Sequence, residues 1–321
     1  MKINKSMLLA LWILALPMSL SAQEKKNIFV ATGPTAGVYY PLGGGLADIL
    51  TKNIPNLNAT AGTTDGSMAN LLLIGQGNAD VGFTMTDAAW DAYKGQDKFK
   101  GKQVPLRALM VLYPNRMHVV TIEGTGIDKI SDLKGKRVST GAPNSATQIM
   151  AYRVLEANGL DPEKDIIRER LDPGKSADAI KDRKLDAFFW VGGVPTPAVT
   201  DLGATPGIKL KLIDHEDSQP ALVKKYGPLY VKDAIPPKAY PGQDKPNAIV
   251  TVWNVLVVNQ NMSDEMAHAI VKTIFDRKED LVRVHKEAQN LNYKFQTNAA
   301  AVIPFHPGAK KYFAEKGIKL D

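Results

Sequence analysis

Three successive strand–turn–helix units between residues 28 and 93 constrain the fold of this chain more than any other feature. The apolar strand at 28–31 runs into a turn rich in glycine, threonine and proline, which precedes the first helix at 38–53. A second small-residue turn at 63–67 opens another helix, and a third helix follows the strand at 81–84. Turns of this kind gather free backbone N–H groups at the carboxyl edge of a sheet, where they can bind small anions.

The remainder of the chain repeats this alternation of strands and helices. A second α/β block extends from about residue 117 to 247 and includes an amphipathic helix at 145–158. A long strand pattern at 248–259 then precedes a helix at 264–278, for which Ser263 is the expected N-cap. The alternation predicts an α/β fold with largely parallel sheets covered by helices.

Three consecutive glycines at 43–45 fall within the first predicted helix. Each glycine in a helix interior costs roughly 1 kcal/mol of stability relative to alanine. We interpret the run as a sign of close packing of this helix on the sheet, in preference to a phosphate loop.

The N-terminus has the pattern of a targeting segment. Lys2 and Lys5 precede ten apolar residues at 7–16, and a zone of small residues follows up to Ala22. A membrane-spanning helix needs about 20 apolar residues, so this stretch is too short to be one. We therefore expect a signal peptide at 1–22, cleaved near Ala22, and an exported, soluble mature protein.

Cysteine is absent from the 321 residues. An exported protein without disulfides relies on its hydrophobic core, which a chain of this length can supply. The absence also excludes a lipid-modified N-terminal cysteine as a membrane tether. We expect the periplasm of a Gram-negative bacterium, where an outer membrane retains soluble proteins, with release into the medium as the alternative.

The charge distribution gives no sign of nucleic-acid binding. Lys and Arg number 40 against 33 Asp and Glu, which gives a net charge of +7, and the lysines are scattered. No basic groove with interleaved aromatic residues is visible, so we expect no nucleic acid as a partner. A solvated basic surface that mildly favours anionic ligands explains the charge.

Several enzyme classes lack their motifs in this chain. No G-x-S-x-G nucleophile elbow occurs, and no G-x-G-x-x-G follows the first strand. Gly174-Lys175-Ser176 resembles the end of a phosphate-binding loop, but Glu169 replaces its leading glycine. No two histidines have metal-ligand spacing, so we expect no metal, no cofactor and no enzyme, although a triad scattered through the sequence stays possible. The five histidines are His118, His215, His268, His285 and His306.

Six segments, in order, resemble the TAXI family, the solute-binding receptors of one class of TRAP transporters. The resemblance covers essentially the whole expected mature chain, and it is the ordered combination that is specific. The segments are ATGPTAGVYYPLGGGL at 31–46, TDGSMANL at 64–71, GNADVG at 77–82, STGAPNSAT at 139–147, DAFFWVGGVPTPAV at 186–199 and HPGA at 306–309.

The resemblance implies a type II-like periplasmic-binding-protein fold of two lobes, each a mostly parallel sheet flanked by helices and joined by a hinge. We place lobe I at 23–115 plus 250–321 and lobe II at 116–249, with chain crossings near 113–117 and 247–254. Such a receptor, expected to be a monomer, closes on a small acidic organic solute and docks on integral-membrane TRAP permease subunits. Glutamate, glutamine and dicarboxylates such as 2-oxoglutarate are the ligands that the family suggests.

Two turns depart from the family pattern. Pro34, Ala36 and Val38 stiffen a first turn that is usually richer in glycine and threonine. In the second block the common Gly-Ser-Gly-Thr is replaced by Asn-Ser-Ala-Thr at 144–147. Both departures put the family's ligand contacts, and the ligand itself, in doubt.

The turns nominate the ligand-binding residues, because a carboxylate gains hydrogen bonds and a favourable dipole at helix N-termini. The alternatives are structural. Ser67 and Ser145 are expected to cap their helices as well, and Thr84 and Thr86 could be ordinary strand-end residues. The candidates are Thr35 and Tyr39 from the first turn, Ser67 from the second, Thr84 and Thr86 from the third, Asn144, Ser145 and Thr147 from the second lobe, and Trp190 as a wall.

Three further alternatives stay open. Arg116 could clamp a carboxylate bidentately, but a surface arginine at the lobe crossing is the simpler reading. A periplasmic enzyme could use the same cleft, and a receptor of this kind could report to a membrane sensor instead of a permease.

Overall fold

The computed structural model describes residues 25–320, so the expected signal peptide at 1–22 lies outside the described residues. The strands are β1 Lys26–Ala31, β2 Leu57–Gly62, β3 Val81–Met85, β4 Leu106–Ile122, β5 Arg137–Ser139, β6 Ile167–Glu169, β7 Ala187–Gly192, β8 Leu210–Leu212, β9 Val231–Ile235 and β10 Asn247–Asn259. The α-helices are α1 Tyr39–Asn53, α2 Ser67–Gln76, α3 Thr86–Lys94, α4 Ala146–Ala157, α5 Pro173–Lys181, α6 Pro197–Ala204, α7 Gln219–Tyr226, α8 Asp264–Asp276, α9 Lys278–Val284, α10 Asn298–Ala301 and α11 Pro307–Glu315. The short 3-10 helices are η1 Asp97–Phe99, η2 Ile130–Leu133, η3 Glu216–Ser218, η4 Lys286–Asn290 and η5 Tyr293–Phe295.

The strands form one sheet in the order β2-β1-β3-β10-β4-β7-β5-β6, with β8 paired to β4 and β9 paired to β10. Strand β1 pairs in parallel with β2 and β3, and β5 pairs in parallel with β6 and β7. The long strands β4 and β10 run antiparallel to each other and to their outer neighbours β7 and β3. The predicted α/β fold with helix-flanked parallel strands is confirmed, and the antiparallel pair lies between its two parallel groups.

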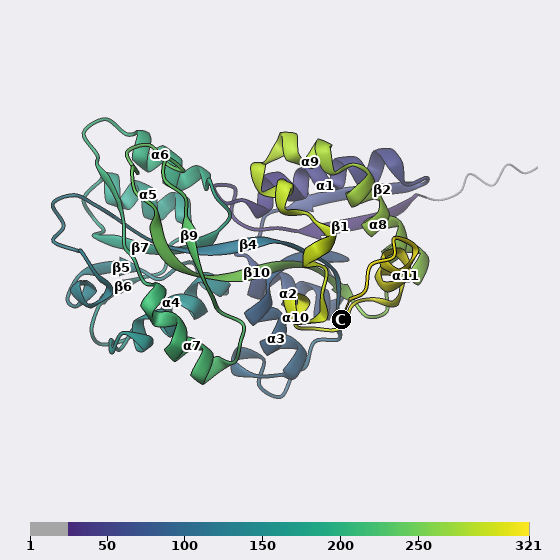
Figure 1. The fold of residues 1–321 in the computed structure, drawn as a ribbon, viewed down its shortest axis with the longest axis horizontal. Helices are drawn as coiled ribbons and strands as arrows, with labels where there is room; N and C mark the ends of the chain where they lie inside the picture. Colours follow the sequence, from purple (N-terminus) through teal and green to yellow (C-terminus); the bar gives the residue numbers. More distant parts are fainter. Residues whose placement is uncertain (1–24, 321) are drawn as a thin grey trace, which may run out of the picture.

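Two halves are visible on either side of this central pair (Figure 1). One contains β1–β3 with α1–α3 and α8–α11, and we call it the β1–β3 half. The other contains β5–β7 with α4–α7, and we call it the β5–β7 half. In the β1–β3 half, α1, α8 and α9 cover one face of the sheet and α2 and α3 cover the other (Figure 1).

The chain passes between the halves along β4 and β10. The sequence pattern predicted separate strands at 106–112 and 118–122, whereas β4 is one strand of 17 residues with Pro114 inside it. At about 3.3 Å per residue such a strand is long enough to belong to both halves. The lobe limits expected at residues 115 and 250 fall inside β4 and β10, which are continuous strands. These limits remain predictions.

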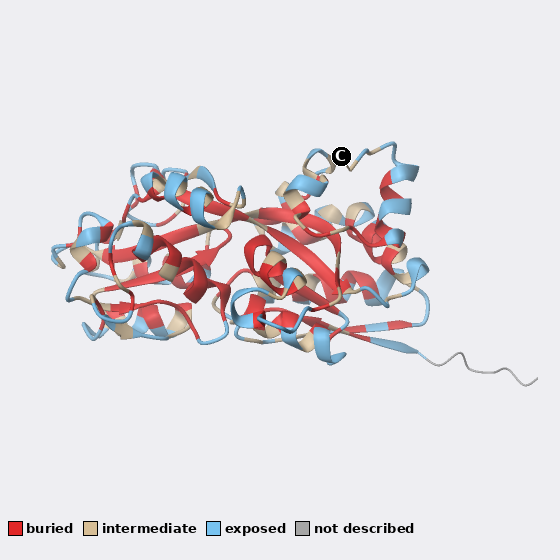
Figure 2. Cartoon of the chain, turned by 90° about the horizontal axis from the view of Figure 1, so that it is seen from below, coloured by how far each residue is buried: buried red, intermediate tan, exposed pale blue. Residues whose placement is uncertain are grey.

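The core follows the central sheet, with its buried residues along the strands and its exposed residues on the outer helices (Figure 2). One glycine of the 43–45 run explains why the first helix can lie so close to this sheet. A Cβ atom on Gly43 would lie 2.2 Å from Cγ2 of Thr32, which follows β1. The predicted close packing of this helix is therefore confirmed.

Helix starts also follow from the sequence at two positions. Ser145 Oγ accepts a hydrogen bond from the backbone N–H of Gln148 at 3.3 Å, and Ser263 Oγ accepts one from Met266 at 3.3 Å. Both serines are therefore N-caps, as predicted, and they fix where α4 and α8 begin.

Candidate functional site

A small cavity lies where the two halves meet. Its volume is about 20 Å³, which is room for roughly one water molecule. The first turn, the middle of β4 and the end of β7 each contribute to its wall, so it joins segments that are far apart in the sequence. Its lining residues are Pro34, Gly37, Val38, Tyr39, Tyr113, Asn115, Trp190, Val191 and Gly192.

Two polar side chains of β4 form the floor of this cavity. Tyr113 and Asn115 are two residues apart on one strand, so their side chains share a face of the sheet. Both residues are buried, at 0% and 1% exposure. Within residues 25–320, neither Tyr113 Oη nor Asn115 Oδ1 has a hydrogen-bond partner. Buried polar atoms almost always have one, so this floor is unusual.

Tyr39 closes the cavity from the first residue of α1. Its hydroxyl donates a hydrogen bond to Asn254 Oδ1, and Asn254 Nδ2 donates to the carbonyl of Tyr113 at 3.3 Å. The Tyr39 ring packs on Phe83 with 5.3 Å between ring centroids. Burial raises the pKa of both Tyr39 and Tyr113 above the ordinary tyrosine value, so both phenols remain protonated at neutral pH.

Trp190 forms the wall contributed by the β5–β7 half. Its indole Nε1 donates to Thr196 Oγ1 at 3.0 Å, which leaves no N–H of the ring for another partner. The ring lies against the first turn, because a Cβ on Gly37 would stand 3.1 Å from it. Trp190 therefore packs in the core and also contacts the first turn of the opposite half.

The starts of α2 and α4 meet across the boundary between the halves. Asn144, an exposed residue with φ of 59°, lies just before α4. Its carbonyl accepts a hydrogen bond from the backbone N–H of Ala69 in the first turn of α2, at 3.2 Å. An N–H group that could otherwise bind an anion is thus engaged by the opposite half.

Three of the predicted threonines are buried, one near the end of a strand and two at the starts of helices. The hydroxyl of Thr147 accepts from the N–H of Val191 at 3.3 Å, and that of Thr84 donates to the carbonyl of Met85 at 3.3 Å. Thr86 is the first residue of α3 and is also buried. The Thr147 and Thr84 hydroxyls bind the backbone, and the three threonines are not among the residues that line the cavity.

The expectation that Ser67 caps α2 is wrong. Gly66 holds the N-cap position with φ of 109°, a conformation suited to glycine, and Ser67 is the first helical residue. The hydroxyl of Ser67 instead accepts a hydrogen bond from the N–H of Met85 at 3.1 Å. It also hydrogen-bonds the Tyr39 side chain, which places Ser67 next to the cavity.

Only some of the nine predicted residues are therefore brought together. Tyr39 and Trp190 line the cavity, and Ser67 contacts Tyr39. Thr35 is exposed and does not line the cavity. Tyr113 and Asn115 were not among the predicted residues, and their local signal is a pair of polar side chains on one face of a mostly apolar strand.

A second contact between the halves is ionic. Arg153 of α4 is 5% exposed, and its guanidinium lies 2.8 Å from Asp91 Oδ2 and 3.7 Å from Asp87 Oδ2 of α3. Arg153 also donates to Tyr230 Oη at 2.6 Å, and Tyr230 donates to Asp87 Oδ2 at 2.9 Å. We call Arg153, Asp87, Asp91 and Tyr230 the ionic cluster.

Burial dominates the titration of this cluster. It raises the pKa of Asp87, and it raises the pKa of Asp91 to about 6, while the nearby Arg153 charge opposes both shifts. Asp97 adds a third carboxylate at 3.2 Å from Arg153. The guanidinium thus has three carboxylates and the Tyr230 hydroxyl as partners.

A third contact involves Arg116, which was one sequence alternative for a carboxylate clamp. Its Nη1 lies 3.0 Å from Glu287 Oε1 of η4, and its Nε forms an ion pair with Asp233 Oδ2 at 2.9 Å. Glu287 Oε1 also accepts from the N–H of Val194 at 2.7 Å, which links η4 to the segment after β7. The Arg116 charge is therefore satisfied within the protein.

The histidine nearest the cavity is structural. His118 Nδ1 donates to the carbonyl of Arg116 at 2.9 Å, and its Nε2 accepts from Tyr240 Oη at 2.7 Å. Burial lowers the pKa of His118 to about 3, so the ring stays neutral. Among residues 25–320, no group of three or more His, Asp or Glu side chains could hold a metal ion. No helix in this part of the chain is long and apolar enough to span a membrane.

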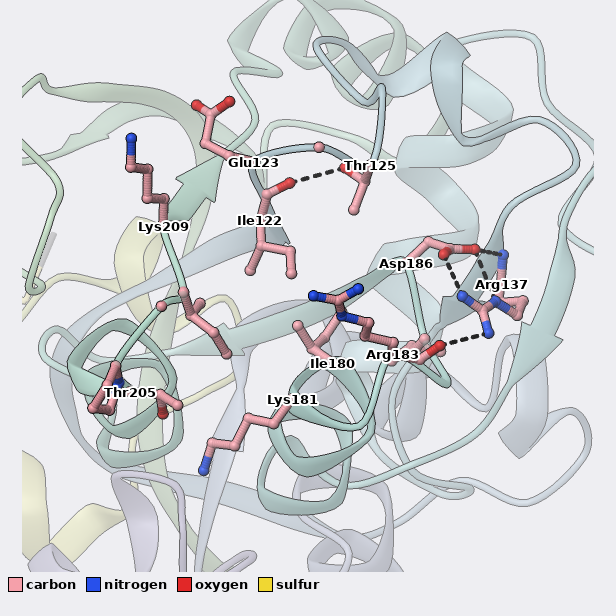
Figure 3. Close-up of a pocket in the computed structure, with 15 residues that line it drawn as sticks. Ile122, Glu123, Thr125, Arg137, Ile180, Lys181, Arg183, Asp186, Thr205 and Lys209 are labelled. Carbon is pink, nitrogen blue, oxygen red and sulfur yellow. Dashed lines mark hydrogen bonds and ion pairs between the residues drawn. The ribbon is translucent and has the colours of Figure 1, made fainter.

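A larger surface groove, of about 780 Å³, lies in the β5–β7 half (Figure 3). Its walls come from the end of β4, from α5 and from the loop after α6. Arg137 and Asp186 are paired with each other at 2.6 Å, and Arg137 also binds the carbonyl of Arg183 (Figure 3). This groove draws on one half only and shares no lining residue with the cavity.

Solved structures of low sequence identity share the fold. A protein from Bordetella bronchiseptica RB50 is 17% identical, with a TM-score of 0.53, 90% of this chain covered and 89% of that chain. The binding protein component of an ABC phosphonate transporter from Pseudomonas aeruginosa is 14% identical, with a TM-score of 0.52 and coverage of 83% and 80%. A protein assigned as an L-cystine ABC transporter from Listeria monocytogenes is 16% identical, with a TM-score of 0.51 and coverage of 83% and 95%.

A family model gives the more specific result. The model of the NMT1-like family matches residues 30–317, which is nearly the whole described part of the chain. The match includes the first turn, the floor of the cavity, the end of β7 and all members of the ionic cluster. The chain therefore belongs to the NMT1-like family.

Proposed function

We propose that this protein is an extracytoplasmic solute receptor that binds a small acidic organic solute between its two halves. The observation that carries the proposal is the buried cavity to which both halves contribute, with two polar atoms on its floor that have no hydrogen-bond partner within residues 25–320. Such a concave site between two bodies is where small ligands commonly bind. Glutamate, glutamine and dicarboxylates such as 2-oxoglutarate are the ligand candidates.

Binding in this account depends on movement of the halves. The N–H of Ala69 bonds to Asn144 while the halves are in contact. Separation of the halves would free this donor for a ligand carboxylate, beside the starts of α2 and α4 where Ser67 and Ser145 lie. Closure around the ligand would then shift a hinge equilibrium along β4 and β10.

The receptor would deliver its solute to a TRAP-type permease in the bacterial inner membrane. It would act in the periplasm and would not catalyse a reaction. The resemblance of the six sequence segments to TAXI receptors supports this partner. The structural relatives described as transporter components support transport more broadly, because two of the three are described as parts of ABC systems.

Native purification followed by mass spectrometry of the released small molecules tests the proposal directly. Thermal shifts with glutamate, glutamine, succinate and 2-oxoglutarate complement it. A ligand at 100 times its dissociation constant adds about 2.7 kcal/mol to the free energy of unfolding. If no organic acid co-purifies and none raises the melting temperature, the proposed ligand class is wrong.

A further inference from the structure

The cavity differs from an ordinary anion site because no charged side chain lines it. Its polar atoms come from tyrosine and asparagine, and its other walls come from tryptophan, proline, valine and glycine. Arg116 follows Asn115 directly in β4, but Glu287 and Asp233 already neutralise its guanidinium. A carboxylate placed on the floor would therefore be buried without a cation, which is strongly unfavourable.

The two floor atoms define what a ligand must offer. Asn115 Oδ1 can only accept a hydrogen bond, and the Tyr113 hydroxyl can donate one. Because burial holds the pKa of Tyr113 above its usual value, this hydroxyl keeps its proton. A ligand group that donates to Asn115 and accepts from Tyr113 would satisfy both atoms at once.

A primary carboxamide meets this requirement. Its NH2 group donates and its carbonyl accepts, and it carries no charge. While the halves are in contact the cavity has room for roughly one water molecule, so the carboxamide would enter only when they separate. The carboxylate at the other end of the ligand would lie toward Ser67 and the start of α2, since Ser67 contacts Tyr39 at the edge of the cavity.

We propose that Tyr113 and Asn115 select the uncharged, hydrogen-bond-donating end of a monocarboxylate, with a primary carboxamide as the fitting group. This inference rests on the proposed function and narrows it, because it excludes dicarboxylates as the preferred ligands. Sites that hydrogen-bond a substrate group reject analogues that lack it more strongly than apolar pockets do.

Matched ligand pairs test the inference. Glutamine and glutamate differ only in carboxamide against carboxylate, and so do succinamate and succinate. Calorimetric titration of the mature protein at pH 7 is expected to show at least tenfold tighter binding of the amide in each pair that binds. Equal or tighter binding of the acid overturns the inference but leaves the receptor proposal intact. If no member of either pair binds, both the inference and the proposed ligand class fail.

A pair of variants tests whether the cavity floor causes the preference for the amide over the acid. Tyr113→Phe removes only the unpartnered hydroxyl, so the protein should fold and its preference for the amide should fall about tenfold. Tyr40→Phe is the control, because Tyr40 is exposed beside Tyr39 and does not line the cavity. If both variants keep the wild-type preference, the floor does not select the ligand and the inference is wrong.

Discussion

Two of the buried contact regions between the halves, the ionic cluster and the cavity floor, differ in how completely their polar groups are paired. In the ionic cluster Arg153 meets Asp87, Asp91 and Tyr230 directly, and each charge has a partner from the opposite half. On the cavity floor the side chains are neutral, and Tyr113 Oη and Asn115 Oδ1 have no partner in the part of the chain that the structure describes. A fully paired cluster holds two bodies together, whereas unpaired buried groups leave hydrogen bonds for a ligand to form. We therefore assign closure of the halves to the ionic cluster and recognition of the ligand to the cavity floor.

Removal of the cluster's cation should have the largest effect on stability. Arg153→Met leaves Asp87 and Asp91 buried without a counter-ion, and loss of one partner of a buried pair costs about 3–5 kcal/mol. Urea unfolding measures this loss, and small-angle scattering should show an increased radius of gyration as the halves separate. Arg170→Met, at an exposed arginine, should change stability by less than about 0.5 kcal/mol. Equal effects of the two variants would contradict a closing role for the cluster.

Acid should destabilise the region beside the floor. Burial lowers the pKa of His118 to about 3, below an unfolded value of about 6.5, so the folded state binds fewer protons between these pH values. Stability is therefore lost as pH falls from 6.5, by about 3 kcal/mol at pH 4 through this residue alone. Urea unfolding of the wild type and of His118→Gln at pH 7 and pH 4 isolates the contribution of His118 to the free energy of unfolding. An identical pH dependence in both proteins would show that His118 is not the source.

The ionic cluster should respond to pH in the opposite direction. The pKa of Asp91, raised by burial to about 6, exceeds its unfolded value of about 3.8, so the folded state binds more protons between them. The stability contribution of Asp91 is lost as pH rises through this window. Solvent screening reduces the effect to about 1 kcal/mol. Asp91→Asn should remove this component from the pH profile of unfolding, and an unchanged profile would argue against a raised pKa.

A glycine that lines the cavity gives the smallest expected effect. Gly37→Ala would place a methyl group 3.1 Å from the Trp190 ring, so the halves must shift slightly when they close. We expect ligand affinity to fall a few-fold, with a change in unfolding free energy below about 1 kcal/mol. Gly44→Ala is the control, since its new Cβ meets nothing within 4 Å and should stabilise α1 by up to about 1 kcal/mol. If Gly44→Ala also weakened ligand binding, the effect of Gly37→Ala could not be attributed to hindered closure of the halves.

Local patterns in the sequence predicted much of the fold. Strand–turn–helix spacing located β1, β3, α1 and α2, and serine N-caps located the starts of α4 and α8. The continuity of β4 was missed because a chain crossing was expected near 113–117, yet the strand is paired with β10 on one side and with β7 on the other. Proline lacks only the N–H, and the register keeps Pro114 opposite Trp253.

The candidate site was less accessible to sequence reasoning. Tyr39 and Trp190 were found because they flank glycine-rich turns, but Asn115 acquires its role only through the pairing of β4 with distant strands. The ionic cluster gave no local signal either, since Arg153 lies 62 residues from Asp91 and 77 from Tyr230 along the chain. Buried polar partners of this kind are fixed by tertiary packing and not by local periodicity.

A crystal structure of the wild-type protein with glutamine tests the central claim most directly. We expect the carboxamide between the two halves, with its NH2 within about 3.2 Å of Asn115 Oδ1 and its carbonyl within that distance of Tyr113 Oη. A ligand bound in the surface groove of Figure 3, or held by Arg153 in place of its aspartates, would contradict the division between closure and recognition.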